Sequence, residues 1–155
     1  MLPKYHFLYG FLFSLFLFYS FPEINFIEAS IIFLASVLID VDHYIFYIFT
    51  KKDLSLKNAY NWFVKKNKKF MKLSYKERLK IVKPIPCIFH GIELTIILIF
   101  LSFISNIFIF ILLGILFHQF LDFINAIYYG FPLQHIGSQT YNIINYKKIN
   151  YKFYT

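Results

Sequence analysis

The sequence predicts an all-helical integral membrane protein with four transmembrane helices, built as a single domain over residues 1–155. Three observations predict this class: hydrophobic residues make up 59% of the 155 residues, charged residues make up only 15%, and four apolar stretches approach the length of a membrane span. A soluble domain of this size cannot bury so much apolar surface, and disordered chains lack the phenylalanine, isoleucine and leucine that dominate here. The sequence therefore excludes both of these classes.

The four apolar stretches run over residues 5–21, 24–49, 86–104 and 107–129. A bilayer-spanning helix needs roughly 20 apolar residues. The second and fourth stretches are longer than this, and the first is shorter. A Pro-Glu pair separates the first two stretches, and a Ser-Asn pair separates the last two. The first stretch ends without the small-residue pattern of a signal-peptide cleavage site, so we expect it to be retained.

The lysines and the arginine predict the orientation of these spans. Twelve of the sixteen lie in residues 51–83, one is Lys4, and three lie in the tail, residues 131–155. With four spans, the N-terminus, the basic loop (residues 51–85) and the tail fall on one side, and the short turns on the other side carry no basic residue. By the positive-inside rule, we expect a protein of the cell membrane whose two termini are cytoplasmic.

The basic loop carries two helix signals. The S-x-x-E pattern that begins at Ser74 is a capping box and predicts a helix over residues 75–83. Asp53 or Ser55 is expected to cap an earlier helix with aromatic residues around Trp62. Basic helices with an aromatic face lie in the headgroup layer and gain roughly 1 kcal/mol per lysine from anionic lipid. Membrane lipids are therefore the expected partners, with a solvated loop as the alternative, and no nucleic acid is expected because no recognition motif accompanies the charge.

Ionisable residues within the four stretches are few and lie in pairs. A charged residue at mid-membrane costs roughly 2.5–3.5 kcal/mol on insertion scales, so such residues mark functional sites. His118 and Asp122 stand four positions apart and share a helix face, and His90 and Glu93 share a face at a spacing of three. The candidate site residues are His6, Asp40, Asp42, His43, His90, Glu93, His118 and Asp122.

The second stretch leaves one question open. Asp40 and His43 share a face, whereas Asp42 points away from Asp40 on an ideal helix. Either only one of the two aspartates is a direct ligand, or the helix is distorted there. Counted at about 1.5 Å per residue from the cytoplasmic end of each span, the whole set lies in the cytoplasmic half of the membrane.

Imidazole and carboxylate groups at one depth are the ligands of zinc, manganese or iron. The sequence therefore predicts a divalent metal, zinc first, with Glu93 or Asp40 as the candidate general base. Cys87, the only cysteine, is expected to be a buried small hydrophobe without a partner, and His135 is expected to lie outside the site. The predicted ligands are His6, Asp42, His43, His90, Glu93, His118 and Asp122.

The order of these motifs resembles the membrane-bound metal-dependent hydrolases, a family that includes the LexA-regulated inner-membrane hydrolases and is distantly similar to zinc-dependent phospholipase C. The resemblance rests on the early histidine, Asp-x-Asp-His at residues 40–43, the His-containing segment 89–93 and Gly-x-x-x-His-x-x-x-Asp at residues 114–122. The chain departs from the family at Ile39, where relatives have proline, and at Glu93, where many carry a second histidine. Either Glu93 replaces that histidine as a ligand, or the number of metal ions differs.

The resemblance implies metal binding and a hydrolytic activity. The leading hypothesis is a hydrolase that acts at the cytoplasmic leaflet, on a phosphoester of a lipid headgroup. A metal or proton transporter is one alternative, although the outer halves of the predicted spans have almost no polar lining. A non-catalytic membrane protein whose metal joins the helices is the other.

Overall fold

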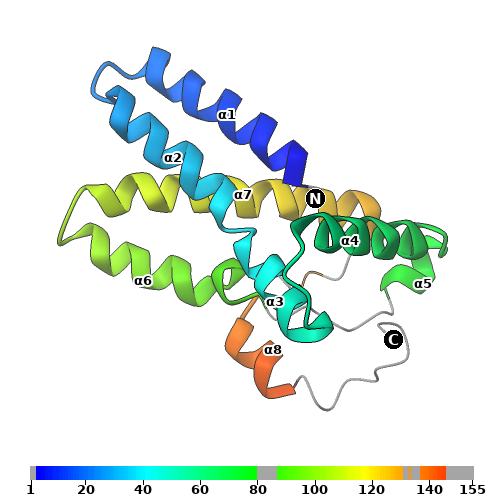
Figure 1. The fold of residues 1–155 in the computed structure, drawn as a ribbon. Coiled ribbons are helices and arrows are strands. Elements are labelled where there is room, and N and C mark those ends of the chain that lie inside the picture. The colour runs from blue at the N-terminus through cyan, green and yellow to red at the C-terminus, as the bar shows by residue number, and fades with distance from the viewer. Residues whose placement is uncertain (1–2, 80–86, 131–132, 134–136, 146–155) are drawn as a thin grey trace.

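The computed structural model of the chain describes residues 3–79, 87–130, 133 and 137–145. All regular structure within these residues is helical (Figure 1), which confirms the predicted all-helical class. The elements are α1 (Pro3–Ser20), α2 (Phe26–Leu38), α3 (Val41–Lys51), α4 (Leu56–Met71), α5 (Tyr75–Leu79), the 3₁₀ helix η1 (Ile88–His90), α6 (Ile92–Ser102), α7 (Ile107–Tyr129) and α8 (Gln139–Asn145).

Two helical hairpins form the body of the protein. α1 pairs with α2, α6 pairs with α7, and α2 packs against α7, which joins the two hairpins. Both hairpin turns lie at the same end of the molecule, on the left of Figure 1. The start of α1, the end of α2 and the start of α6 therefore meet near the middle of α7, at the opposite end of the hairpins.

Two helical segments among the described residues are long and apolar enough to cross a membrane. They are Phe26–Lys51, which comprises α2 and α3, and α7, and they coincide with the second and fourth predicted spans. α6 is apolar but has only 11 residues, a length of about 17 Å against a hydrocarbon core of roughly 30 Å. α1 does not meet the criterion, so the four-span topology stays a prediction.

The third predicted span is not one continuous helix. The segment that precedes α6 forms the 3₁₀ turn η1, in which the N–H of His90 donates to the Cys87 carbonyl at 3.0 Å. Gly91 then adopts an extended conformation, with φ −82° and ψ 154°. The α-helix can begin only after this extended residue, at Ile92, so the prediction of a helix over residues 86–104 was wrong at its start.

The second predicted span is divided between α2 and α3. The N–H of Asp40 donates to the Val37 carbonyl at 3.4 Å, and the N–H of His43 donates to the Asp40 carbonyl at 3.1 Å. These three-residue bonds tighten the backbone into a 3₁₀-like turn, and the helix axis changes direction there (Figure 1). Of the two alternatives left open by the sequence, the distorted helix is the one observed.

The two helices expected in the basic loop are present. Ser55 caps α4, because its hydroxyl accepts the Asn58 N–H at 3.3 Å. The capping box at Ser74 is formed with Glu77, whose carboxylate accepts the Ser74 N–H at 2.8 Å. The resulting helix α5 is described only as far as Leu79, and the rest of the predicted range lies outside the described residues.

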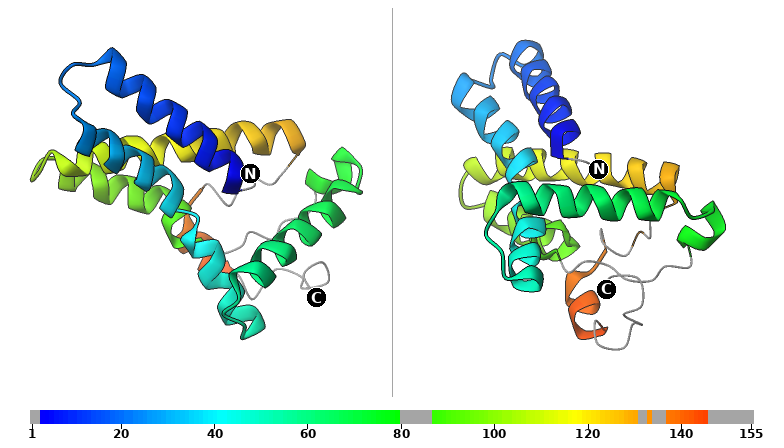
Figure 2. Two further views of the ribbon diagram at one scale, coloured as in Figure 1. Left: turned by 45° about the horizontal axis from the view of Figure 1, so that its top comes forward. Right: turned by 45° about the vertical axis from the view of Figure 1, so that its right-hand side comes forward.

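α4 turns back sharply from the end of α3, as both views of Figure 2 show. Asp53 holds this turn, accepting hydrogen bonds from the Tyr47 hydroxyl, the Ser55 N–H and the Asn58 side chain. The hydrogen bond from Tyr47, more than the others, holds the pKa of Asp53 below its ordinary value. The Trp62 ring lies 5.6 Å from the Tyr47 ring, so part of the aromatic face of α4 packs on α3.

Glycines allow α2 to approach both of its neighbours closely. A Cβ added to Gly114 of α7 would overlap the Ile32 carbonyl oxygen and the Ala35 side chain of α2. A Cβ added to Gly10 of α1 would overlap the Ser36 hydroxyl. α2 is therefore held between α1 and α7 with its backbone at Ser36 next to the ionisable residues of both.

We expect Gly114→Ala to lower the melting temperature, measured by circular dichroism on purified protein. The new methyl meets a backbone carbonyl that cannot rotate away, so overpacking should cost about 1–3 kcal/mol. Because the overlap is with backbone, we expect this cost to exceed the gain of about 1 kcal/mol in helix propensity. Leu116→Ala, at a position 42% exposed on the same helix, is the control and should change the melting temperature less. An unchanged or raised melting temperature for Gly114→Ala would contradict the close contact.

Candidate metal centre

Seven of the eight ionisable residues singled out by the sequence come together where α1, the α2–α3 turn, η1 and α7 meet. Their side chains are buried or nearly so, except for His43, which is 29% exposed. Three overlapping groups, which also include Cys87, have ligand atoms within 4.8 Å of one another and can hold a metal ion. The seven residues are His6, Asp40, Asp42, His43, His90, His118 and Asp122.

The orientation of the His118 ring is fixed by the backbone of α2. Its Nδ1 lies 2.7 Å from the Ser36 carbonyl oxygen. A carbonyl can only accept, so Nδ1 carries the hydrogen and donates it. In the neutral ring, Nε2 then has a free lone pair, and it points into the cluster. A histidine whose second nitrogen donates to a backbone carbonyl is typical of metal ligands.

His90 is oriented in the same way by a carboxylate. Its Nδ1 lies 3.0 Å from Oδ2 of Asp42, and the N–H of Phe89 donates to the same oxygen at 3.1 Å. With Nδ1–H donating to Asp42, the Nε2 of His90 also presents a lone pair to the cluster. The two Nε2 atoms of His90 and His118 lie only 3.1 Å apart.

Four atoms lie around the contact between His90 and His118: the Nε2 atoms of these two histidines, Oδ1 of Asp40 and Oδ2 of Asp122. His90 Nε2 lies 3.5 Å from the Asp40 atom and 3.8 Å from the Asp122 atom. His118 Nε2 lies 3.7 and 3.4 Å from the same two atoms. Ligands about 2.0–2.1 Å from a tetrahedral zinc are about 3.4 Å apart. The distances from the two nitrogens to the two oxygens are therefore close to those between ligands of one metal ion.

His6 lies behind this set, on α1. Its ring stacks on the His118 ring, with centroids 3.8 Å apart and an interplanar angle of 15°. Its Nε2 lies 3.2 Å from Oδ1 of Asp122, and its Nδ1 is buried without a hydrogen-bond partner. Because a buried polar atom without a partner costs about 1–3 kcal/mol, His6 fits a site in which an added cation rearranges these contacts.

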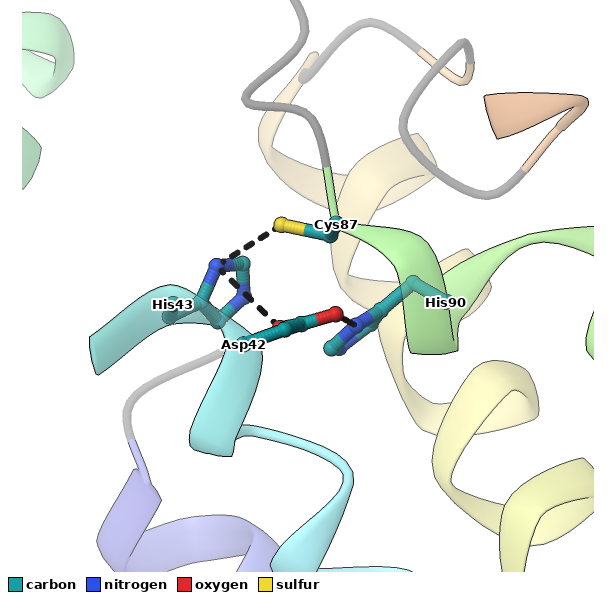
Figure 3. A group of neighbouring side chains, drawn as sticks. All are labelled: Asp42, His43, Cys87 and His90. Atoms are coloured by element: carbon teal, nitrogen blue, oxygen red, sulfur yellow. Dashed lines mark hydrogen bonds and ion pairs between the residues drawn. The ribbon is translucent and has the colours of Figure 1, made fainter. Parts of the chain in front are cut away.

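Cys87 is the residue that the sequence missed. It is buried, as expected, but the expectation that it has no partner was wrong. Its Sγ lies 3.0 Å from Nδ1 of His43, and Figure 3 shows the two side chains pointing toward one another, with Asp42 between His43 and His90. The two residues are 44 positions apart, so no periodic pattern could have paired them.

Glu93, in the first turn of α6, lies apart from the cluster and contacts the start of α8. Its Oε1 accepts hydrogen bonds from the Ser138 hydroxyl at 2.6 Å and the Thr140 N–H at 3.0 Å, and its Oε2 accepts the Gln139 N–H at 3.1 Å. A carboxylate is favourable there because the first N–H groups of a helix have no helical partner. This arrangement gives no support to a ligand or base role for Glu93. His135 lies outside the described residues.

Comparisons with known proteins add no assignment. No family model matches the chain, and neither the curated proteins nor the solved structures provide a match. The likeness to metal-dependent hydrolases therefore rests on the sequence motifs alone.

We expect purified protein to retain a divalent transition metal and His118→Ala/Asp122→Ala to lose it, because the double variant removes two of the four atoms around the contact between His90 and His118. Metal content is measured by mass spectrometry after gel filtration. Glu93→Gln is the matched control: it alters a carboxylate outside the cluster and should leave metal content nearly unchanged. Equal metal content in the wild type and the double variant would contradict a centre at these residues.

Proposed function

We propose that the protein is an integral membrane, metal-dependent hydrolase that cleaves a phosphoester of a lipid headgroup at the cytoplasmic leaflet. The observation that carries this proposal is the set of two nitrogen and two oxygen atoms around the contact between His90 and His118. Both histidines are oriented by hydrogen bonds to acceptors outside this set. The metal identity that we favour is zinc, because imidazole and carboxylate ligands suit it.

The membrane assignment is supported by the surface as well as by the two long apolar segments. Large apolar side chains are exposed along α1, α6 and α7, including Phe16, Phe100 and Phe120, at 60%, 67% and 57%. Such a surface would be costly in water and is expected against lipid. Both hairpin turns lie at one end of the hairpins, and the basic helix α4 lies at the other (Figure 1). Four spans with a cytoplasmic loop require this arrangement.

The roles within the centre follow from exposure. A catalytic zinc site has three protein ligands and one open position, whereas a structural site has four protein ligands. We assign His90, His118 and Asp122 as the ligands, because their side chains are at most 3% exposed. Asp40 is 12% exposed and borders His43, at 29%. We therefore assign Asp40 as the general base at the open position.

The metal would supply Lewis-acid polarisation of the ester and activation of water. The chain supplies the surroundings. Asp40 accepts the proton of the attacking water, and His43, with its Nε2 3.5 Å from Oδ1 of Asp40, is placed to receive or release it on the open side. Helix α4, with its lysines, passes beside this side, because α4 packs on α3 and the Phe63 ring lies 5.7 Å from the His43 ring. Their charge favours a phosphate-bearing substrate.

The topology is tested by reporter fusions. A reporter at Ser105, in the α6–α7 turn, should lie outside the cytoplasm, and a reporter after Thr155 should lie inside, because the basic residues are retained on the cytoplasmic side. A third fusion at Leu73, between α4 and α5, should agree with the C-terminal one. If the Ser105 and C-terminal reporters lie on the same side, the four-span topology is wrong.

The catalytic role is tested by Asp40→Asn. We expect the rate of phospholipid hydrolysis in mixed micelles, measured as release of the headgroup, to fall by roughly 10²–10⁴-fold, the usual effect of removing a general base. The metal content should stay the same. Asp53→Asn, a carboxylate outside the cluster, is the control. Loss of metal along with activity would instead make Asp40 a fourth ligand and the site structural. Absence of activity in the fully metal-loaded wild type on all phosphoesters tried would contradict the hydrolase.

A further inference from the structure

A second group of ligand atoms lies beside the four-atom centre and uses none of its atoms. It consists of Oδ1 of Asp42, Nδ1 of His43 and Sγ of Cys87. The first two come from the start of α3, and Cys87 directly precedes η1. Figure 3 shows the three side chains facing one another. Cys87 is fully buried and Asp42 is 5% exposed, so water has little access to two of the three.

The two oxygens of Asp42 have different surroundings. Oδ2 accepts the hydrogen bonds from His90 and from the Phe89 N–H. Oδ1 is buried and has no hydrogen-bond partner, and Nδ1 of His43 lies 4.0 Å from it. A buried carboxylate oxygen without a partner is strongly unfavourable. Its position opposite a thiol and an imidazole indicates a binding site for a cation.

We propose that Asp42, His43 and Cys87 form a second metal site, which takes a thiophilic divalent cation through one oxygen, one nitrogen and one sulfur. A sulfur ligand selects zinc or a chemically similar soft ion over magnesium, calcium or manganese. Three protein ligands leave one position open, as in catalytic zinc sites. The open side is at His43, the most exposed member of the cluster.

The distances suit such a site after a small movement of one ring. For tetrahedral zinc, with zinc–sulfur about 2.3 Å and zinc–nitrogen about 2.0–2.1 Å, the sulfur and nitrogen ligands are about 3.6 Å apart and two nitrogen or oxygen ligands about 3.4 Å apart. The Cys87–His43 distance of 3.0 Å is shorter than this, and the His43–Asp42 distance of 4.0 Å is longer. Turning His43 away from Cys87 and toward Asp42 corrects both.

Asp42 and His90 connect the two sites. Asp42 would bind the second cation through Oδ1 while its Oδ2 continues to orient His90, whose Nε2 faces the first centre. The second site therefore does not depend on the ligands of the first, but its occupant lies next to it. Two adjacent divalent ions are a recurrent arrangement in phosphoester hydrolysis, so this site extends the proposed function without requiring it.

The test uses cobalt, which reports a thiolate ligand through a charge-transfer absorption in the near ultraviolet. Purified full-length protein is stripped with chelator and titrated with Co²⁺ alone. We expect two equivalents to bind, with the charge-transfer band from one of them. Because Cys87 is the only cysteine, a band in the wild type can come from no other residue. No band at saturation would overturn the proposal without any variant being needed.

Two variants separate this site from the first centre. Cys87→Ser should abolish the band and reduce stoichiometry from two equivalents to one, with the helical circular dichroism spectrum unchanged. His118→Ala should keep the band and lose the other equivalent. Two equivalents bound by Cys87→Ser would overturn the proposal. A wild type that binds one equivalent with the band would support the Cys87 site and contradict the four-atom centre, so the two proposals can fail separately.

Discussion

The hydrogen bond from His118 to the Ser36 carbonyl is the contact on which the site depends. It is 2.7 Å long and buried, and it forms only because α7 and α2 approach closely at Gly114. It fixes which nitrogen of His118 carries hydrogen and so directs a lone pair toward the cluster. The same stretch of α2 contacts Gly10 of α1, which brings His6 onto the His118 ring. Helix packing and ligand chemistry are therefore set at one place in the fold.

The break between α2 and α3 has an equally direct consequence. In a continuous helix, residues two positions apart point about 200° apart around the axis, so Asp40 and Asp42 could not both face the cluster. The 3₁₀-like turn at Asp40 redirects α3, and Asp40, Asp42 and His43 all reach the histidines of η1 and α7. A mid-helix turn of this type often marks a functional position. Here it allows one short segment to serve two groups of ligands.

Local spacing made part of the fold and of the site predictable from the sequence. The parts that depend on contacts between distant residues were not predictable in this way. His118 with Asp122 and the capping box at Ser74 follow from intervals of three and four residues, and the structure has both. The contact of Cys87 with His43 depends on the path of the chain between them, which no interval encodes. Glu93 was assigned to the cluster because it shares a helix face with His90. Gly91 is extended and α6 starts after it, so this face does not exist. Glu93 instead accepts hydrogen bonds from the N–H groups of Gln139 and Thr140 at the start of α8.

A hydrogen-bonded network of protonated histidines is the simplest alternative to a metal, and the distances distinguish the two. One proton between His90 Nε2 and His118 Nε2 would satisfy those two atoms at 3.1 Å. It would leave Oδ1 of Asp40 and Oδ2 of Asp122 at 3.4–3.8 Å from the same nitrogens, beyond the 2.7–3.2 Å typical of N–H to oxygen hydrogen bonds. A divalent cation bound by His90, His118 and Asp122, with Asp40 beside its open position, would offset buried negative charge that a single proton cannot. The four nitrogen–oxygen distances are longer than typical hydrogen bonds and close to the distances between metal ligands, and this favours the metal.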